Sequence, residues 1–213
     1  MAVALVIGAS RGIGLETLKR LLEAGHEVRA LARGAHSIPI EHPNLRKISG
    51  DALDPAAVES AVEGADCVIQ TLGAPKDAGA VLTGTTLFSR STRLLIDAMR
   101  KKGVHRLVAV TGLGAGDSRG YGGLLYKAAF ILVLKRIYDD KDIQERMIRA
   151  SGLEWTIVRP GLLTSGPATG RARALTNKND WTAGSISRAD VAEFLAREAF
   201  ERRFVGQTPV LIQ

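Results

Sequence analysis

The stretch Val3-Ala4-Leu5-Val6-Ile7-Gly8-Ala9-Ser10-Arg11-Gly12-Ile13-Gly14 decides the fold of this 213-residue chain. Its apolar run has the length of a buried strand, its glycines form a turn, and a helical leucine pattern begins at Leu15. A strand, a glycine turn and a helix in this order open a dinucleotide-binding sheet. Because glycine has no Cβ, a pyrophosphate can approach the backbone, and the helix N-terminus offers free N–H groups. An ordinary strand-to-helix turn is the alternative interpretation.

The composition is that of an ordinary globular protein. The chain has 46% hydrophobic and 24% charged residues, and its length suits one domain, residues 1–213. No apolar run reaches the roughly 20 residues that span a bilayer, and we expect no signal peptide before the first strand. The single cysteine, Cys67, excludes an internal disulfide and fits the reducing cytoplasm. Because Cys67 stands in an apolar strand pattern, we expect it to fill the core.

The formal charge of +7 indicates a basic surface. The basic residues are spread over many predicted helices, and no aromatic stacking platform accompanies them. We therefore expect no nucleic-acid or membrane partner, and a surface that attracts a phosphate-bearing cofactor. The four histidines are scattered and predict no metal site.

The rest of the chain alternates strand and helix patterns, which is typical of a parallel sheet with helices on both faces. We predict an α/β fold, a three-layer, doubly wound, mostly parallel sheet of the Rossmann type in a single domain. Ligands bind such a sheet at the carboxyl ends of its strands. Later strands are expected at Glu27–Ala32, Leu45–Ile48, Asp66–Leu72, Arg106–Val110, Trp155–Val158 and Gln207–Ile212, and helices at Pro55–Val62, Thr85–Lys102 and Ser187–Ala199.

Two arginines predict the form of the cofactor. An acidic residue near the end of the second strand would bind the ribose hydroxyls of NAD, but this chain has Arg33 there and Arg11 in the glycine turn. Two guanidinium groups suit a 2′-phosphate, so NADP(H) is favoured over NAD(H). The alternative is that Arg33 is an ordinary exposed arginine. After the third strand, Asp51 could accept a hydrogen bond from the adenine amino group or simply form a turn.

Four segments carry a resemblance to a known family: Gly8–Gly14, Gly50-Asp51 with Leu72-Gly73, K-D-I-Q-E-R-M-I-R-A-S-G-L-E-W-T-I-V-R-P-G at Lys141–Gly161, and Ser187–Val191. Together they resemble the atypical short-chain dehydrogenases/reductases of the NAD(P)H-binding, NmrA-like group, and among these the biliverdin-IXβ reductase/flavin reductase. The resemblance implies hydride transfer from a reduced nicotinamide to a planar conjugated acceptor. It also implies that the cofactor is surrounded by Gly8, Ser10, Arg11, Gly12, Ile13, Gly14, Arg33, Asp51, Ala52, Leu72, Gly73, Thr111, Lys141 and Pro160.

One departure from the wider superfamily concerns catalysis. Most short-chain dehydrogenases use a Tyr-x-x-x-Lys pair, in which the lysine prepares the tyrosine to deliver a proton. Here Ile137 stands four residues before Lys141, whereas Tyr138 stands three before it, still on the same helical face. Tyr138 is a candidate proton donor, with packing as the alternative, and Lys141 is expected near the cofactor or at the surface. Thr111 is the candidate that orients the substrate.

These features predict an NADPH-dependent oxidoreductase that transfers hydride to a flavin, a quinone or another conjugated carbonyl acceptor, as a monomer or homodimer. The glycine-rich segment Gly112–Gly123 favours an enzyme, because it leaves room for an acceptor. The absent Tyr-x-x-x-Lys spacing favours the alternative, an NmrA-like binding protein that senses NADP(H) without turnover. A sugar-nucleotide epimerase is disfavoured, because the segment after the sixth strand is too short for the usual substrate domain.

Overall fold

The computed structural model describes residues 1–74, 84–121 and 135–213 of the chain. Strands and helices alternate along it, as the sequence patterns predict. The strands are β1 (Val3–Ile7), β2 (Glu27–Ala32), β3 (Leu45–Ser49), β4 (Cys67–Gln70), β5 (Arg106–Val110), β6 (Glu154–Pro160), β7 (Leu162–Thr164), β8 (Arg173–Leu175), β9 (Ser185–Ser187) and β10 (Val210–Ile212). The helices are α1 (Gly12–Glu23), α2 (Pro55–Val62), α4 (Leu87–Lys102), α6 (Lys135–Arg149) and α7 (Arg188–Glu201).

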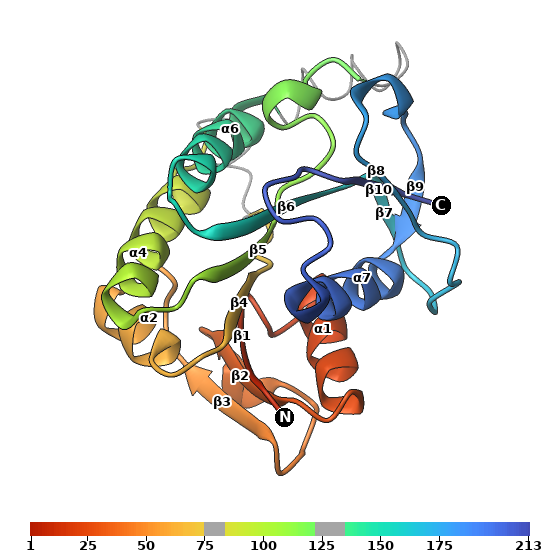
Figure 1. Cartoon of the computed structure of the whole chain (residues 1–213). Helices are drawn as coiled ribbons and strands as arrows, with labels where there is room; N and C mark the ends of the chain where they lie inside the picture. The colour runs from red at the N-terminus through yellow and green to blue at the C-terminus, as the bar shows by residue number, and fades with distance from the viewer. Residues whose placement is uncertain (75–83, 122–134) are drawn as a thin grey trace.

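Eight of the strands form one twisted sheet in the order β3-β2-β1-β4-β5-β6-β10-β8 (Figure 1). Neighbouring strands in it are parallel except β10 and β8, which run antiparallel. The chain moves outward from β1 to β3 and then returns to place β4 on the other side of β1. This reversal is the switch point at which doubly wound sheets bind ligands, so the predicted Rossmann-like fold is confirmed.

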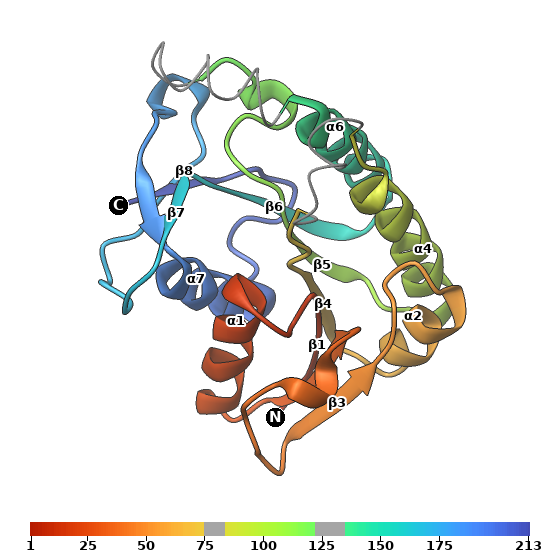
Figure 2. The ribbon, with the colours of Figure 1, turned by 180° about the vertical axis from the view of Figure 1, so that it is seen from behind.

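Helices cover both faces of the sheet and make the three layers visible in Figures 1 and 2. Alternate residues of β1 are buried on opposite faces of the sheet. Ala4 and Val6 pack in the core under α1 and α7, whereas Leu5 and Ile7 pack in the core under α2, α4 and α6. Because both faces of each central strand are buried, the strands read as continuous apolar runs. Cys67 lies in the first of these cores, as predicted, and burial raises the pKa of its thiol to about 12.

The helix starts agree with the sequence prediction where the capping residue directly precedes the helix in the chain. The side chain of Asp54 accepts a hydrogen bond from the N–H of Ala56 at 3.0 Å, and Ser187 caps α7 by accepting from the N–H of Asp190 at 3.0 Å. The start of α4 differs from the prediction because its cap comes from another helix. Asp140 of α6 accepts from the N–H of Phe88 at 2.8 Å, which sets the beginning of α4 at Leu87.

Other boundaries also differ from the sequence prediction. Strand β4 ends at Gln70 rather than Leu72, and β6 continues through Pro160. The last strand begins at Val210, because Gln207 makes only an isolated bridge to Thr156. The short parallel pair β7–β9 was not expected, since three-residue strands are too short to show a periodic pattern.

Candidate cofactor and substrate site

The glycine loop after β1 packs tightly against its own sheet. Gly8 has a φ of +89°, and a Cβ on it would lie 3.0 Å from backbone atoms of Thr71. A Cβ on Gly14 would collide with the carbonyl oxygen of Gly8. These two glycines are therefore required for α1 to approach the ends of β1 and β4, rather than for a ligand to approach the backbone.

Gly12 faces open space instead. It has a φ of +58°, and the nearest atoms to a Cβ on it are two atoms of the Arg188 side chain at 4.0 Å. Helix α1 begins at this residue, and the side chain of its N-cap residue, Arg11, makes no capping hydrogen bond. The N–H groups of the first turn are consequently available to a ligand, which is the property that an anion-binding helix N-terminus needs.

The two arginines predicted to bind a 2′-phosphate lie at the same edge of the sheet as the glycine loop. Arg33 follows β2, and Arg11 follows β1, its hydrogen-bonded parallel neighbour. Both side chains are exposed, and neither makes an ion pair or a side-chain hydrogen bond within the described residues. Two unpaired cations at the sheet edge where α1 begins without a side-chain cap fit a phosphorylated dinucleotide.

The other predicted cofactor residues differ in their hydrogen bonds and burial. One oxygen of Asp51 accepts from the N–H of Leu53 at 2.9 Å, so this side chain forms the turn that was the alternative to adenine binding. The side chain of Ala52 is buried in the core under α2 and α4, and Leu72 packs against the same core. Among the described residues, no atom lies within 4 Å of the Cβ position of Gly73, which follows the carboxyl end of β4.

At the end of β5, the structure brings the three catalytic candidates together. The ammonium of Lys141 donates to the carbonyl oxygen of Thr111 at 2.5 Å and lies 5.6 Å from the ring centroid of Tyr138. The hydroxyl of Tyr138 is 2.5 Å from the Cβ position of Gly112, the residue after Thr111. The spacing of three residues on α6 therefore does place Tyr138 and Lys141 on one face.

Of the two positions expected for Lys141, the surface is wrong, since only 7% of the residue is exposed. Its ammonium lies 4.5 Å from the ring centroid of Phe88. Burial lowers the pKa of Lys141 to about 8, although the charges of Glu145 and Asp140 oppose that shift. A lysine with this pKa is mostly protonated at neutral pH and still releases its proton easily.

Sequence reasoning missed a buried ion pair that holds Thr111. The hydroxyl of Thr111 donates to Glu145 at 2.8 Å, and the same carboxylate accepts two hydrogen bonds from Arg159, at 3.0 and 2.5 Å. Because a carboxylate only accepts, the proton of Thr111 is directed at Glu145, and its oxygen lone pairs remain for a ligand. The available signal was the arginine that follows the apolar run of β6.

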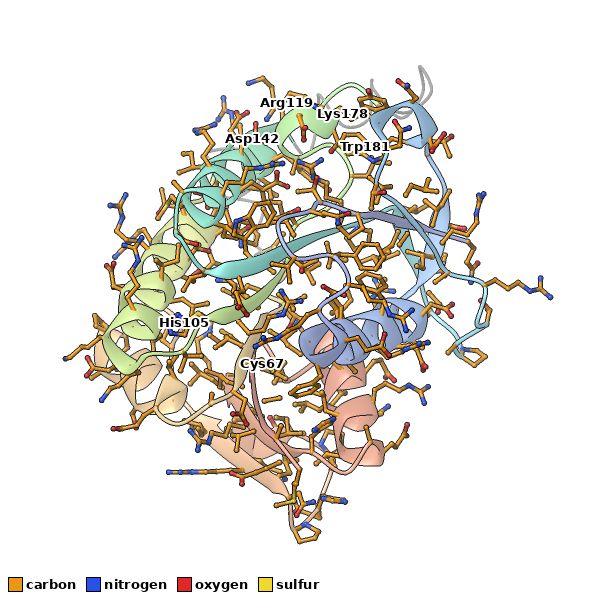
Figure 3. All side chains as sticks on the ribbon, viewed as in Figure 1. Cys67, His105, Arg119, Asp142, Lys178 and Trp181 are labelled. Carbon is orange, nitrogen blue, oxygen red and sulfur yellow. The ribbon has the colours of Figure 1, made fainter. Side chains whose placement is uncertain are left out.

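A second acid connects this pair to the C-terminal part of the chain. Asp117, in the short 3-10 turn Gly116–Ser118, accepts from Arg159 at 2.7 Å and pairs with Lys178 at 2.7 Å. Burial raises the pKa of Asp117, but the hydrogen bonds from Lys178 and Arg159 outweigh it and hold the value at about 2. The guanidinium carbon of Arg159 lies 5.1 Å from the ring centroid of Trp181. Trp181 and Lys178 lie at the same end of the molecule (Figure 3).

The segment after β5 is described only as far as Tyr121, so the last residues of Gly112–Gly123 lie outside the described residues. Its described part is attached to β6: the N–H of Leu113 donates to the carbonyl oxygen of Pro160 at 3.0 Å. Pro160 ends β6, and the parallel order of the strands brings it to the same edge as Gly8, Arg33 and Thr111.

A sequence profile described as NAD(P)H-binding matches residues 8–202, from the glycine loop to the end of α7. The chain belongs to this NAD(P)H-binding family. The match begins at Gly8 and includes the Lys141–Gly161 run, which agrees with the resemblance drawn from the sequence. The uncapped N-terminus of α1 and the unpaired arginines beside it are what such a cofactor requires.

Relatives of this NAD(P)H-binding chain share its fold along nearly its whole length. The structure of ChuY, an anaerobilin reductase from Escherichia coli O157:H7, is 30% identical with a TM-score of 0.78, covering 99% of this chain and 96% of that one. A short-chain dehydrogenase/reductase from Veillonella parvula in complex with NADP is 18% identical with a TM-score of 0.83, covering 100% and 94%. An uncharacterized sugar epimerase of Bacillus subtilis, YhfK, is 27% identical over 88% of this chain and 83% of its own length.

Neither a membrane-spanning helix nor a metal-binding cluster occurs in the part of the chain that the structure describes. None of its helices is long and apolar enough to cross a membrane. No group of three or more histidine, cysteine, aspartate or glutamate residues there is placed to hold a metal ion.

Proposed function

We propose that this protein is an NADPH-dependent reductase that transfers hydride to a flavin, a quinone or another conjugated carbonyl acceptor. The observation that carries the proposal is the pairing of two features along one sheet edge. Unpaired Arg11 and Arg33 stand beside an uncapped helix N-terminus, and Thr111, Tyr138 and Lys141 converge at the end of β5. The reductase activity named for ChuY agrees with this function.

Each group has a part in the proposed reaction. The first turn of α1 binds the pyrophosphate, and Arg11 and Arg33 bind the 2′-phosphate. The reduced nicotinamide, when bound, supplies the hydride. The acceptor that takes up the hydride needs one proton, which Lys141 delivers from its ammonium and regains from water. Tyr138 is the second candidate for this proton.

A screen of NADPH oxidation tests the proposal. The absorbance of NADPH is followed with a panel of flavins and quinones, and cofactor binding is measured separately by titration. We expect turnover with at least one planar acceptor. Tight binding of NADP(H) without turnover on any acceptor would instead support an NADP(H)-sensing, NmrA-like regulatory protein.

The proton source is tested by the pH dependence of turnover. Because burial lowers the pKa of Lys141 to about 8, the rate is expected to fall as the pH rises through that value. Lys141→Met should lower the rate and remove this decline, whereas Tyr138→Phe should keep it. A decline that persists in Lys141→Met would assign the proton to another group.

The role of Thr111 is tested by Thr111→Val, with Thr111→Ser as the matched control. The valine keeps the shape but removes the hydroxyl that bonds to Glu145. We expect turnover to slow roughly tenfold, the worth of about one hydrogen bond, with cofactor affinity nearly intact. Serine should restore most of the rate, and an unchanged rate in valine would remove Thr111 from the site.

We also expect the protein to act in the cytoplasm on a small conjugated acceptor, without a nucleic-acid or membrane partner. The oligomeric state is expected to be a monomer or homodimer. Light scattering coupled to size-exclusion chromatography distinguishes these two.

A further inference from the structure

Arg188 is an arginine from the far end of the sequence that lies at the glycine loop. It is the first residue of α7, directly after the cap residue Ser187. Its Cδ and Nε atoms are each 4.0 Å from the Cβ position of Gly12, the first residue of α1. Helices α1 and α7 pack against each other on one face of the sheet (Figure 1), and the Arg188 side chain connects their first residues.

Part of the guanidinium of Arg188 is anchored, and part is uncommitted. Its Nη1 donates to the carbonyl oxygen of Thr164 at 2.9 Å and to the hydroxyl of Ser165 at 3.4 Å. Its Nε and Nη2 make no hydrogen bond with any described residue. These two nitrogens form the edge of a guanidinium that binds two oxygens of a phosphate or carboxylate at once.

The charge of Arg188 also has no counterion within the described residues. Its two partners, Thr164 and Ser165, are neutral, and no carboxylate lies within ion-pair distance of it. The nearest acid in sequence, Asp190, uses its oxygens on the N–H groups of Thr169 and Gly170 and on the hydroxyls of Ser187 and Thr169. A half-buried guanidinium without a counterion attracts an anion more strongly than an exposed one does.

We propose that Arg188 binds the pyrophosphate of the dinucleotide through Nε and Nη2, while Nη1 holds the guanidinium in place. This inference rests on the proposed cofactor site. The pyrophosphate is favoured over the 2′-phosphate because Arg188 lies at Gly12, where the free N–H groups of α1 begin. The 2′-phosphate belongs instead at the end of β2, near Arg33.

Equilibrium titrations of NADPH and NADH against the full chain test this assignment. In Arg188→Gln we expect the affinities for both nucleotides to fall by the same factor, roughly ten- to a hundredfold, because both carry the pyrophosphate. Arg188→Lys keeps the charge but lacks the two-nitrogen edge, so a smaller loss is expected. Arg173→Gln is the matched control, since Arg173 is exposed on β8 and its side chain has no partner among the described residues.

Each result decides between named alternatives. Unchanged affinities in Arg188→Gln overturn the assignment, and a loss confined to NADPH overturns it in favour of the 2′-phosphate. If Arg188→Gln does not fold, Arg188→Lys decides: lower affinity for both nucleotides at an unchanged Tm supports the assignment, and wild-type affinity overturns it. Wild-type protein that binds neither nucleotide is a distinct result, and it overturns the proposed function together with this inference.

Discussion

Arg33, which follows β2, and Arg159, near the end of β6, lie at the same edge of one sheet, yet they have opposite surroundings. Arg33 is exposed and has no partner among the described residues. Arg159 is fully buried, bonded to Glu145 and Asp117 and covered by Trp181. Burying a charge is costly unless it is paired, so Arg159 requires its acids for the fold itself. An exposed arginine is solvated and needs no acidic partner, so it stays available to an anionic ligand.

The difference divides the site into two regions. The region around the glycine loop carries uncompensated positive charge on Arg11, Arg33 and Arg188, which suits a cofactor with several phosphates. In the region around β5 and β6, Glu145 and Asp117 neutralise the buried charge of Arg159, and Glu145 also accepts the hydrogen bond from Thr111. We propose that charge in the first region binds the cofactor, whereas Glu145 in the second region holds the hydroxyl of Thr111 in place.

The largest effect on stability is expected from removing a partner of the buried Arg159. Glu145→Ala should lower the free energy of unfolding by about 3–5 kcal/mol, because Arg159 stays buried without its main partner. Urea denaturation measures the change. Glu201→Ala is the control, since it breaks an exposed pair with Arg197 and should cost less than about 1 kcal/mol. Similar small effects for both variants would show that Arg159 does not depend on Glu145.

The next largest effect concerns the close packing of the glycine loop. Gly14→Ala should lower the free energy of unfolding by about 1–3 kcal/mol, because the added methyl group collides with the backbone of Gly8. Gly73→Ala is the control, since no described residue lies within 4 Å of its Cβ position, and it should leave stability unchanged. Thermal denaturation followed by circular dichroism compares the two variants. Equal Tm values would mean that α1 shifts to accept the methyl group.

Reversing an unpaired charge should alter binding without altering the fold. Arg33→Asp is expected to lower the affinity for NADPH at least roughly tenfold while changing that for NADH much less, because only NADPH has the 2′-phosphate. Arg46→Asp reverses the charge of an exposed residue on β3 and is the control for the change in net charge. Equal losses for both nucleotides in Arg33→Asp would refute the phosphate contact.

The smallest effect is the acid sensitivity of the paired region. The folded-state pKa of Asp117 is about 2, below its ordinary value of 3.8, so its contribution is present above about pH 4 and is lost as the pH falls to 2. Asp117→Asn should therefore be less stable than the wild type at pH 7 and equal to it near pH 2. The carboxylate is 37% exposed and screened by solvent, so the difference should stay below about 1 kcal/mol. Urea titrations at both pH values measure it, with the exposed Asp180→Asn as control.

Much of the molecule could be predicted from sequence because its signals are local. The apolar runs indicate strands buried on both faces, and the order of strands and helices indicates a doubly wound sheet. The caps at Asp54 and Ser187 are set by residues within three positions of each other, so they were readable directly. The glycine loop and the three other segments that carry the resemblance indicate the NAD(P)H-binding family.

The rest depends on contacts between residues far apart in the chain, which no local pattern records. Gly14 is required by a close approach of α1 to β1, and α4 begins where Asp140 of α6 caps it. The fold alone makes Arg159 a buried partner of Glu145 and brings Arg188 to Gly12. Sequence determined the layers and the cofactor family, because periodicity and turn chemistry are short-range. Tertiary structure decided which charges are neutralised, because burial and counterions depend on neighbours that only folding supplies.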